Sequence, residues 1–330
     1  MQNAQVESNY QKSNQPPGTI AAPKLHPRNR HQGRYDFAQL IDASPALGQF
    51  VNKNAYGELS IEFADPQAVK ALNRALLTSY YGIQAWDIPA GSLCPSVPGR
   101  ADYLHCLADL LAGCNNGVIP KTKAVRGLDI GTGASCIYPI IGHGEYGWNF
   151  VATDINATSL ANAQAMIDSN PPLAKRIELR LQASPSAYFK GIVGEDDWFD
   201  FSVCNPPFHA SAYEAREGAQ RKWHNLGKSA NETPPLNFGG HDAELWCSGG
   251  EQAFIQGMIA ESALIPTRCF WFSSLVSKSA NLASIYAALK QANVGEHKTI
   301  AMTQGQKKSR LVAWTFLSPL QRAAWRKLRW

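Results

Sequence analysis

The chain lacks the cysteine pattern of a metal-binding or disulfide-stabilised protein. Its 330 residues contain seven cysteines, but no two form a C-x-x-C pair and their spacing follows no metal-ligand or disulfide framework. A long apolar run is also missing, so neither a signal peptide nor a membrane-spanning helix is predicted. These absences predict a cytoplasmic protein without a metal, a membrane partner or an obligate protein partner. Cys136 and Cys204 are interpreted as small apolar residues.

Acidic residues are scarce at both ends of the chain. Residues 1–35 hold five Lys or Arg against one Glu, and residues 301–330 hold seven Lys or Arg and no acid, although the whole chain has a net charge of only +5. Basic arms on a more acidic central part are typical of nucleic-acid contact. In the first arm, Arg28, Arg30 and Arg34 are predicted to contact RNA. The second arm is equally consistent with RNA contact and with a solvated terminus.

Composition and hydrophobic periodicity divide the chain into three parts. Residues 1–24 are rich in Gln, Asn, Ser and Pro, which predicts a disordered lead. Residues 25–116 carry apolar stripes at helical spacing and predict a small helical, RNA-facing module that leads into the core. Residues 117–330 alternate between strand and helix patterns. This alternation predicts an α/β domain with a mostly parallel sheet covered on both faces.

Seven segments of the main domain are predicted strands. The last two are joined by a basic turn without a helix, so we expect them to pair antiparallel at one edge of the sheet. The predicted strands are Val125–Ile130, Trp148–Thr153, Ile177–Gln182, Phe199–Cys204, Thr267–Ser273, Lys298–Thr303 and Arg310–Phe316, with helices such as Ala157–Ser169 and Glu251–Ser262 between them.

A glycine-rich turn, Leu128-Asp129-Ile130-Gly131-Thr132-Gly133, follows the first predicted strand. A dinucleotide-binding turn needs a glycine or alanine where this chain has Cys136, and no Lys-Ser/Thr pair follows to make a phosphate loop. The acid before the glycines suits a cationic amine better than a pyrophosphate. Asp154, at the end of the next strand, can accept both hydroxyls of a ribose. An amine with a ribose and an adenine describes S-adenosylmethionine, which is the predicted cofactor.

The segment Asn205-Pro206-Pro207-Phe208 follows the strand Phe199–Cys204. The Asn205 side chain and the Pro206 carbonyl can accept the two N–H hydrogens of a planar amine, and so favour the tetrahedral geometry that methylation requires. Pro206 and Pro207 stiffen the turn and remove donors from its rim. Phe208 offers a ring face for a flat base. The turn therefore predicts methyl transfer to a planar nitrogen, against the alternative of a loop that only ends a strand.

Four segments together resemble the bacterial ribosomal large-subunit RNA adenine-N6 methyltransferase F family. They are His26–Phe37, Pro95–Tyr103, Arg126–Tyr138 and Cys204–Phe208. The resemblance runs from about Leu25 to the C-terminus, and extends to a eukaryotic group of RNA adenine-N6 methyltransferases. It implies a class I S-adenosylmethionine-dependent, Rossmann-like methyltransferase fold. The implied substrate is adenine 1618 of 23S rRNA, either as naked rRNA or in a large-subunit assembly intermediate.

The resemblance also implies cofactor-binding residues. Asp129, Gly131, Gly133 and Ser135 fall in the block that holds the methionine end of the cofactor, and Asp154 matches the ribose-binding acid. Arg100 stands where relatives place an arginine near the cofactor carboxylate; without the resemblance it reads as a surface arginine. Either Gln182 or Ser184 is expected beside the cofactor adenine, and Gln182 is the preferred choice.

Residues 209–250 carry no sustained periodicity, which is unusual for a packed domain. The segment starts directly after the predicted catalytic turn and contains Arg221 and Lys222. It predicts a substrate loop that grips RNA; disordered filler is the alternative. His209 is interpreted as a pocket-wall or surface residue, since methyl transfer from an activated sulfonium needs no dedicated base.

Three other functions share parts of this pattern. A protein glutamine-N5 methyltransferase uses a similar turn on a planar amide, but with Tyr as the usual aromatic and without basic arms. A DNA adenine methyltransferase would share the chemistry. An RNA-binding protein without catalysis is disfavoured because Asp129, Asp154 and Asn205 are all present.

Overall fold

The computed structural model describes residues 25–121, 124–214, 242–304 and 307–330. The predicted disordered lead lies outside the described residues, as do Arg221 and Lys222. Within the described part of the chain, no helix combines the length and the apolar character that crossing a membrane requires.

The N-terminal part is helical apart from a short hairpin. It contains α1 (Phe37–Ala43), the 3₁₀ helix η1 (Pro45–Phe50), the antiparallel strands β1 (Val51–Lys53) and β2 (Leu59–Ile61), α2 (Pro66–Tyr81) and α3 (Val97–Cys114). Asp36 and Asp65 cap α1 and α2 by accepting backbone N–H groups of the first turns. The helical stripes read from the sequence are therefore confirmed as helices.

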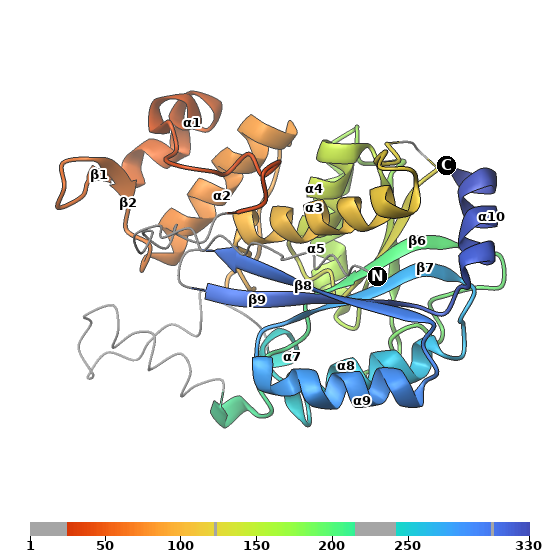
Figure 1. Ribbon diagram of the computed structural model, residues 1–330. Helices are drawn as coiled ribbons and strands as arrows, with labels where there is room; N and C mark the ends of the chain where they lie inside the picture. The colour runs from red at the N-terminus through yellow and green to blue at the C-terminus, as the bar shows by residue number, and fades with distance from the viewer. Residues whose placement is uncertain (1–24, 122–123, 215–241, 305–306) are drawn as a thin grey trace, which may run out of the picture.

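A seven-stranded sheet forms the centre of the molecule (Figure 1), in the order β5-β4-β3-β6-β7-β9-β8. The strands are β3 (Arg126–Ile130), β4 (Asn149–Asp154), β5 (Ile177–Leu181), β6 (Phe199–Cys204), β7 (Cys269–Val276), β8 (Glu296–Gln304) and β9 (Lys307–Thr315). The first five are parallel, and β9 runs antiparallel to both β7 and β8. The mostly parallel sheet with a reversed edge hairpin is thus confirmed.

Two strands differ from their predicted bounds by three residues at one end. The predicted strand Arg310–Phe316 starts earlier, because β9 begins at Lys307 and pairs with β8 from there. The predicted strand Thr267–Ser273 is shifted, because β7 starts at Cys269 and extends to Val276. The Arg268 N–H donates to the Ile265 carbonyl, so the chain is still turning at Arg268. The end is later than predicted because β9 pairs with β7 as far as Val276.

Helices cover both faces of the sheet, with α8 and α9 on the side opposite α3 and α4 (Figure 1). The remaining helical elements are α4 (Ile137–Tyr146), α5 (Ala157–Asp168), α7 (Asp242–Leu245), α8 (Gly250–Ser262), η3 (Ser279–Asn281), α9 (Leu282–Gln291) and α10 (Pro319–Arg329). Successive strand residues point to opposite faces, so Phe150 and Phe201 pack on the α3 side, whereas Leu128 and Val151 pack on the α8 side. The N-terminal helices share the first of these cores with the sheet.

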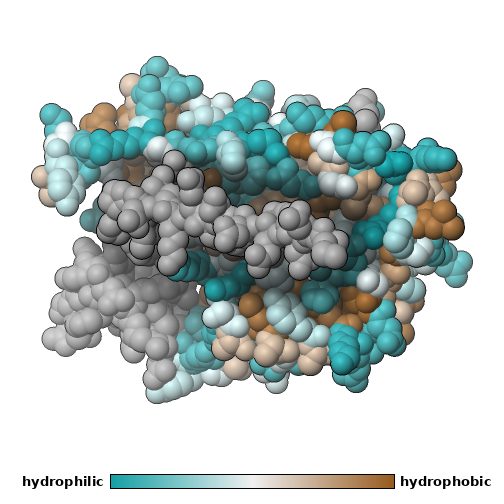
Figure 2. All heavy atoms as spheres, in the orientation of Figure 1, coloured by the Kyte–Doolittle hydropathy of each residue, from teal (hydrophilic) through white to brown (hydrophobic). Residues whose placement is uncertain are grey.

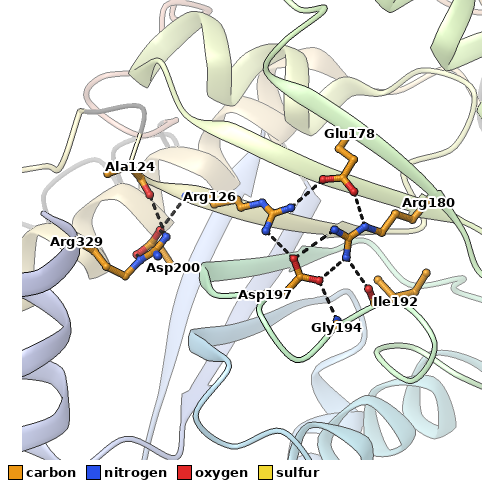
Figure 3. Close-up of polar contacts among 9 residues, drawn as sticks. All are labelled: Ala124, Arg126, Glu178, Arg180, Ile192, Gly194, Asp197, Asp200 and Arg329. Atoms are coloured by element: carbon orange, nitrogen blue, oxygen red, sulfur yellow. Dashed lines mark hydrogen bonds and ion pairs between the residues drawn. The ribbon is translucent and has the colours of Figure 1, made fainter.

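A buried carboxylate anchors the end of the C-terminal helix. Asp200, at the start of β6, has no exposed surface and accepts the Trp325 and Trp330 indole N–H groups at 2.7 and 2.8 Å. It also accepts the Arg126 backbone N–H and the Arg329 guanidinium (Figure 3). Arg329 of the basic C-terminal arm therefore has a structural role, which the sequence pattern did not predict. Hydrophobic residues are visible over α10 in Figure 2, where Leu320 and Leu328 are exposed.

Asp200→Asn is expected to lower the free energy of unfolding by about 2–3 kcal/mol. The amide removes the charge that pairs with Arg329, and its NH₂ group faces N–H donors on whichever side it lies. Urea unfolding measures the change. Asp196→Asn, on an exposed loop residue, is the matched control and should change stability by less than about 0.5 kcal/mol. Equal stabilities of the two variants would contradict this role for Asp200.

Candidate active site

A cavity opens at the carboxyl edge of the three central strands. Ile130 at the end of β3 pairs with Thr153 of β4 and with Cys204 of β6, so the residues that follow all three strands lie at one level. Eight of the residues predicted to form the site line this cavity: Arg100, Gly131, Gly133, Ser135, Asp154, Gln182, Asn205 and Pro207. The glycine turn and the Asn-Pro-Pro turn are thereby brought together.

The glycine turn needs glycine for steric reasons. Gly131 and Gly133 have φ angles of +75° and +63°, which favour residues without a side chain. The N–H groups of Gly131 and Thr132 both donate to the Thr153 carbonyl at 2.9 Å, which ties the turn to β4. A Cβ on Gly133 would lie 3.1 Å from Glu244 Oε1. The turn therefore lets a ligand approach the backbone closely.

Asp154 is oriented by two backbone donors. Its Oδ2 accepts the Gly133 N–H and its Oδ1 accepts the Asn156 N–H, both at 2.8 Å. Burial raises the pKa of this carboxyl, while these N–H groups oppose the shift. Each oxygen keeps a lone pair that can accept a ribose hydroxyl. The arrangement fits the ribose-binding role proposed for Asp154.

Asn205 places an unsatisfied acceptor in the cavity wall. Its Oδ1 is buried and has no hydrogen-bond partner among the described residues. Pro206 and Pro207 are buried, and Pro207 lines the cavity beside Asn205. Pro206 and Phe208 are not lining residues, and the Phe208 ring packs against the hydrophobic core. The stacking role of Phe208 and the acceptor role of the Pro206 carbonyl stay predictions.

Arg100 enters the cavity from α3. Its Nη1 donates to the Tyr138 hydroxyl at 2.8 Å, and its guanidinium lies 5.3 Å from the centre of the Tyr138 ring. No carboxylate forms a salt bridge with Arg100 in the described part of the chain. Its position in the cavity fits the contact with a ligand carboxylate that the resemblance implies.

Asp129 is the predicted site residue whose position differs most from expectation. It does not line the cavity, and both its carboxylate oxygens are buried without a hydrogen-bond partner among the described residues. Burial raises its pKa to about 7, the Thr132 side chain and Arg100 oppose the shift, and Asp154 adds to it. A direct contact between Asp129 and a cofactor amine stays a prediction.

Several cavity residues had no signal in the sequence. Tyr188 and Phe254 form an edge-to-face aromatic pair with ring centres 4.7 Å apart and supply an apolar wall near Gln182. Glu244 adds a carboxylate from α7. Of the two residues considered for the adenine end, Gln182 lines the cavity and Ser184 does not. Aromatic residues in loops and helices are common, so their spacing alone could not identify them.

The segment after the Asn-Pro-Pro turn is fixed to the end of the long loop. His209 pairs with Trp246 in a parallel bridge, its N–H donating to the Leu245 carbonyl and its own carbonyl accepting the Cys247 N–H, both at 3.1 Å. His209 does not line the cavity. No group of His, Cys, Asp and Glu able to hold a metal ion occurs among the described residues.

The arginines of the N-terminal arm are paired with acids. Arg28 pairs with Asp109 and Arg30 with Glu145, at 2.7 and 2.9 Å, and Arg34 pairs with Glu58. Arg28 also donates to the His105 carbonyl. The arm is folded against the protein, so its predicted RNA contacts would compete with these ion pairs.

Comparisons with known proteins identify relatives over nearly the whole chain. A family model described as RNA methyltransferase matches residues 19–318. The ribosomal RNA large subunit methyltransferase F of Ectopseudomonas mendocina is 57% identical over 309 residues, which cover 93% of each chain. The protein of the same name in Photobacterium profundum is 53% identical over an alignment 336 residues long, which covers 97% of this chain and 99% of that protein.

Solved structures of similar fold include two from METTL16. The hMettl16 catalytic domain in complex with MAT2A 3′UTR hairpin 1 has a TM-score of 0.75 and 32% sequence identity, and the match covers 89% of this chain and 96% of that one. The N-terminal domain of human METTL16 in complex with SAH has a TM-score of 0.71 and 29% identity, with 89% and 99% coverage.

Asp129→Asn is expected to change how the stability of the cofactor-free protein depends on pH. The unfolded chain releases the Asp129 proton near pH 4, whereas the folded protein holds it to about pH 7. The folded state therefore binds more protons in this window, and ionisation lowers the free energy of unfolding as the pH rises. The variant has no carboxyl to ionise at position 129. Its free energy of unfolding relative to that of wild type should therefore rise by on the order of 2 kcal/mol between pH 5 and pH 8.

Urea unfolding at four pH values across that window measures the difference between the two proteins. Groups that titrate in both cancel, so the slope of the difference isolates residue 129. A difference that does not change with pH would show that the Asp129 carboxyl titrates normally.

Proposed function

The chain belongs to the ribosomal RNA large subunit methyltransferase F family, and we propose that its target is the N6 amino group of adenine 1618 in 23S rRNA. The family resemblance read from the sequence is confirmed, and the protein is an S-adenosylmethionine-dependent RNA methyltransferase. The identity of the methylated nucleotide, the amino group that receives the methyl group and the residues that act on it are proposed. Because ribosomes are made in the bacterial cytoplasm, we also place the protein there.

The buried Asn205 Oδ1 is the observation that carries the proposal. A buried oxygen without a partner costs about 1–3 kcal/mol, and an incoming N–H group removes that cost. The oxygen lies in the same cavity as the glycine turn and Asp154. An amino group held there would therefore lie within reach of the methyl group of a cofactor bound along the turn.

The chemistry divides between the cofactor and the protein. S-adenosylmethionine supplies a methyl group on a positively charged sulfur, which is already activated for attack. Asn205 accepts one N–H of the target amine and draws the nitrogen lone pair out of conjugation, with the Pro206 carbonyl as the proposed second acceptor. Asp154 orients the ribose and Arg100 the carboxylate. After transfer the nitrogen releases a proton to water, so no side chain has to act as a base.

Adenine must leave its stack to reach this cavity, which a single-stranded or irregular RNA permits at low cost. The cavity wall near the Asn-Pro-Pro turn is apolar, with Pro207, Tyr188 and Phe254. A glutamine side chain could also present a planar amide to Asn205, but the chain belongs to a family of RNA methyltransferases, so RNA is the substrate class.

The edge hairpin supplies a basic surface next to the cavity. β9 pairs with β7 up to Arg310 and Val276, and the β8–β9 ladder continues for three more pairs beyond that point. Since β7 is parallel to β6, the tip extends past the carboxyl edge, where Asn205 lies. Lys308 is exposed on this extension and Arg310 is half-exposed. We propose that both contact RNA phosphates, in addition to the arm with Arg28, Arg30 and Arg34.

Methylation assays with labelled S-adenosylmethionine separate the candidates. The substrates are a 23S rRNA fragment containing adenine 1618, the same fragment with guanine at that position, the matching DNA, and a release factor. Label in the first substrate alone supports the proposal, and label in the guanine-substituted fragment, the DNA or the release factor would overturn it. Adding a large-subunit assembly intermediate shows which form of the RNA is preferred.

Asn205→Ala is expected to lower turnover by at least about 100-fold, because the amine loses the acceptor that favours its reacting geometry. Cofactor affinity should stay within about threefold, since the ribose and carboxylate contacts are unchanged. Single-turnover methylation and calorimetric titration of the cofactor measure the two quantities. Turnover close to wild type would rule out the assigned role.

The double substitution Lys308→Gln/Arg310→Gln is expected to weaken RNA binding by roughly tenfold and to reduce the slope of log K against log salt by about 1.5, for two lost phosphate contacts. Lys175→Gln/Lys290→Gln removes the same charge from exposed lysines elsewhere on the protein. If both double variants show the same slope, the hairpin does not contact RNA.

A further inference from the structure

The linker between α2 and α3, residues 82–96, contacts the segment that follows the glycine turn. Its Trp86 is buried, and the indole Nε1 donates to the Ser135 carbonyl at 3.0 Å. Ser135 lines the cavity, whereas Trp86 does not. Trp86 therefore holds the cavity wall from inside the protein, without a surface of its own in the cavity.

A second side chain donates to the neighbouring carbonyl. Asn162 of α5 donates through Nδ2 to the Ala134 carbonyl at 2.9 Å and to the Asp87 carbonyl at 3.0 Å. It therefore joins the residue after Trp86 to the residue before Ser135. Two consecutive carbonyls of the segment behind the cavity are thus bound by side-chain donors, one from the linker and one from α5.

The linker is itself fixed by hydrogen bonds. The buried Asn170 side chain accepts the N–H groups of Gln84 and Ala85 at 2.8 and 3.2 Å, and donates to the Ala85 carbonyl at 2.6 Å. Arg74 of α2 donates to the Trp86 carbonyl at 2.9 Å. Satisfied polar networks of this kind hold the neighbouring backbone in one arrangement. The backbone that carries the indole is therefore a firm support for the residues that it contacts.

The segment that these donors hold has an unfavourable backbone conformation. Cys136 has φ +49° and ψ +35°, in the left-handed region that residues other than glycine rarely adopt. Gly131 and Gly133 have positive φ angles as well. Such a conformation costs free energy and persists only where its surroundings hold it. Since the N–H groups of the turn bind β4, Trp86 and Asn162 supply the restraint on the carbonyl side.

We propose that Trp86, assisted by Asn162, is a positioning residue for S-adenosylmethionine, and that it holds the glycine turn and Ser135 in the conformation that binds the cofactor. The inference rests on the proposed cofactor site at this turn, and is independent of which nucleotide is methylated. A turn that samples other conformations binds its ligand more weakly, in proportion to the population that is competent to bind. The N-terminal module therefore contributes to cofactor affinity through a side chain behind the cavity wall.

Trp86→Phe removes the indole N–H and keeps an aromatic ring in the core. We expect the Kd of S-adenosylmethionine, measured by calorimetric titration without RNA, to rise by about tenfold, the effect of one lost hydrogen bond. The KM for the cofactor in rRNA methylation should rise to a similar extent, whereas kcat at saturating cofactor should stay within about twofold, because the bound cofactor restores the turn. Amide hydrogen exchange of residues 131–136 should be faster in the cofactor-free variant than in wild type.

Trp148→Phe is the matched control. Trp148 is buried and donates its indole N–H to the Pro120 carbonyl at 2.8 Å, just before β4 and so at the opposite edge of the sheet from the cavity. Both substitutions remove one indole donor from one backbone carbonyl, and urea unfolding gives the loss of stability in each. The control should change the cofactor Kd by less than about twofold. A similar rise of Kd in both variants would mark a general effect of weakened packing and would overturn the proposal.

Asn162→Ala tests the same restraint at a half-buried position, and decides the question if Trp86→Phe does not fold. Loss of its donor to Ala134 should raise the cofactor Kd by about fivefold. Gln164→Ala removes an exposed amide from the same helix and should leave the Kd within about twofold. An unchanged Kd in Asn162→Ala and in any folded Trp86→Phe protein would refute the positioning role.

Asp154→Ala tests the cofactor site itself. If cofactor binding is lost in this variant but unchanged in Trp86→Phe and Asn162→Ala, the site is supported and the positioning role is refuted. If Asp154→Ala binds the cofactor like wild type, the assigned site is wrong and the positioning role fails with it. The RNA specificity tests have no bearing on these affinities, so the choice of nucleotide can fail separately.

Discussion

The site depends on three parallel strands that end in register. Because Ile130 pairs with both Thr153 and Cys204, the residues after β3, β4 and β6 emerge at one level. The chain then reverses differently at each strand: a glycine turn, a carboxylate with two N–H donors, and an Asn-Pro-Pro turn. A register shift of one residue would turn each of these side chains to the other face of the sheet. The proposed cofactor and substrate contacts are thus separated by only one strand spacing.

Acidic residues at the two edges of the sheet have different partners and opposite pKa shifts. Away from the cavity, Asp197 is bound by Arg126 and Arg180 (Figure 3), and these hydrogen bonds lower its pKa even though burial acts in the other direction. Asp200 is surrounded by donors from α10. At the cavity, in contrast, burial raises the pKa of Asp129 and Asp154. Acids far from the site are neutralised by the protein, and acids at the site are left for a ligand to satisfy.

Short-range patterns predicted the fold and the two turns that meet at the cavity, whereas long-range partners could not be predicted. The Gly131 turn and Asn205 follow buried strands, so their placement at one edge follows from parallel topology. Arg28, Arg30 and Arg34 looked like a free basic arm because their acidic partners lie 24 to 115 residues away in sequence. Likewise the basic C-terminus gave no hint that Asp200 would bind Trp325 and Trp330. Glu244 lies in a segment without periodicity, so no sequence pattern indicated it. Only the folded chain brings its side chain close to Gly133.

The unsatisfied oxygen of Asn205 limits what the enzyme can select by itself. In the role proposed for it, this oxygen would discriminate against groups that offer no N–H, since a carbonyl or methyl group there would leave it buried and unpaired, at about 1–3 kcal/mol. That cost separates an amine from a keto group by roughly tenfold to a hundredfold. It cannot separate one adenine of a ribosome from the many others. Selection of a single nucleotide must therefore come from contacts outside the cavity, and the basic hairpin beyond Val276 is the surface that we propose for them.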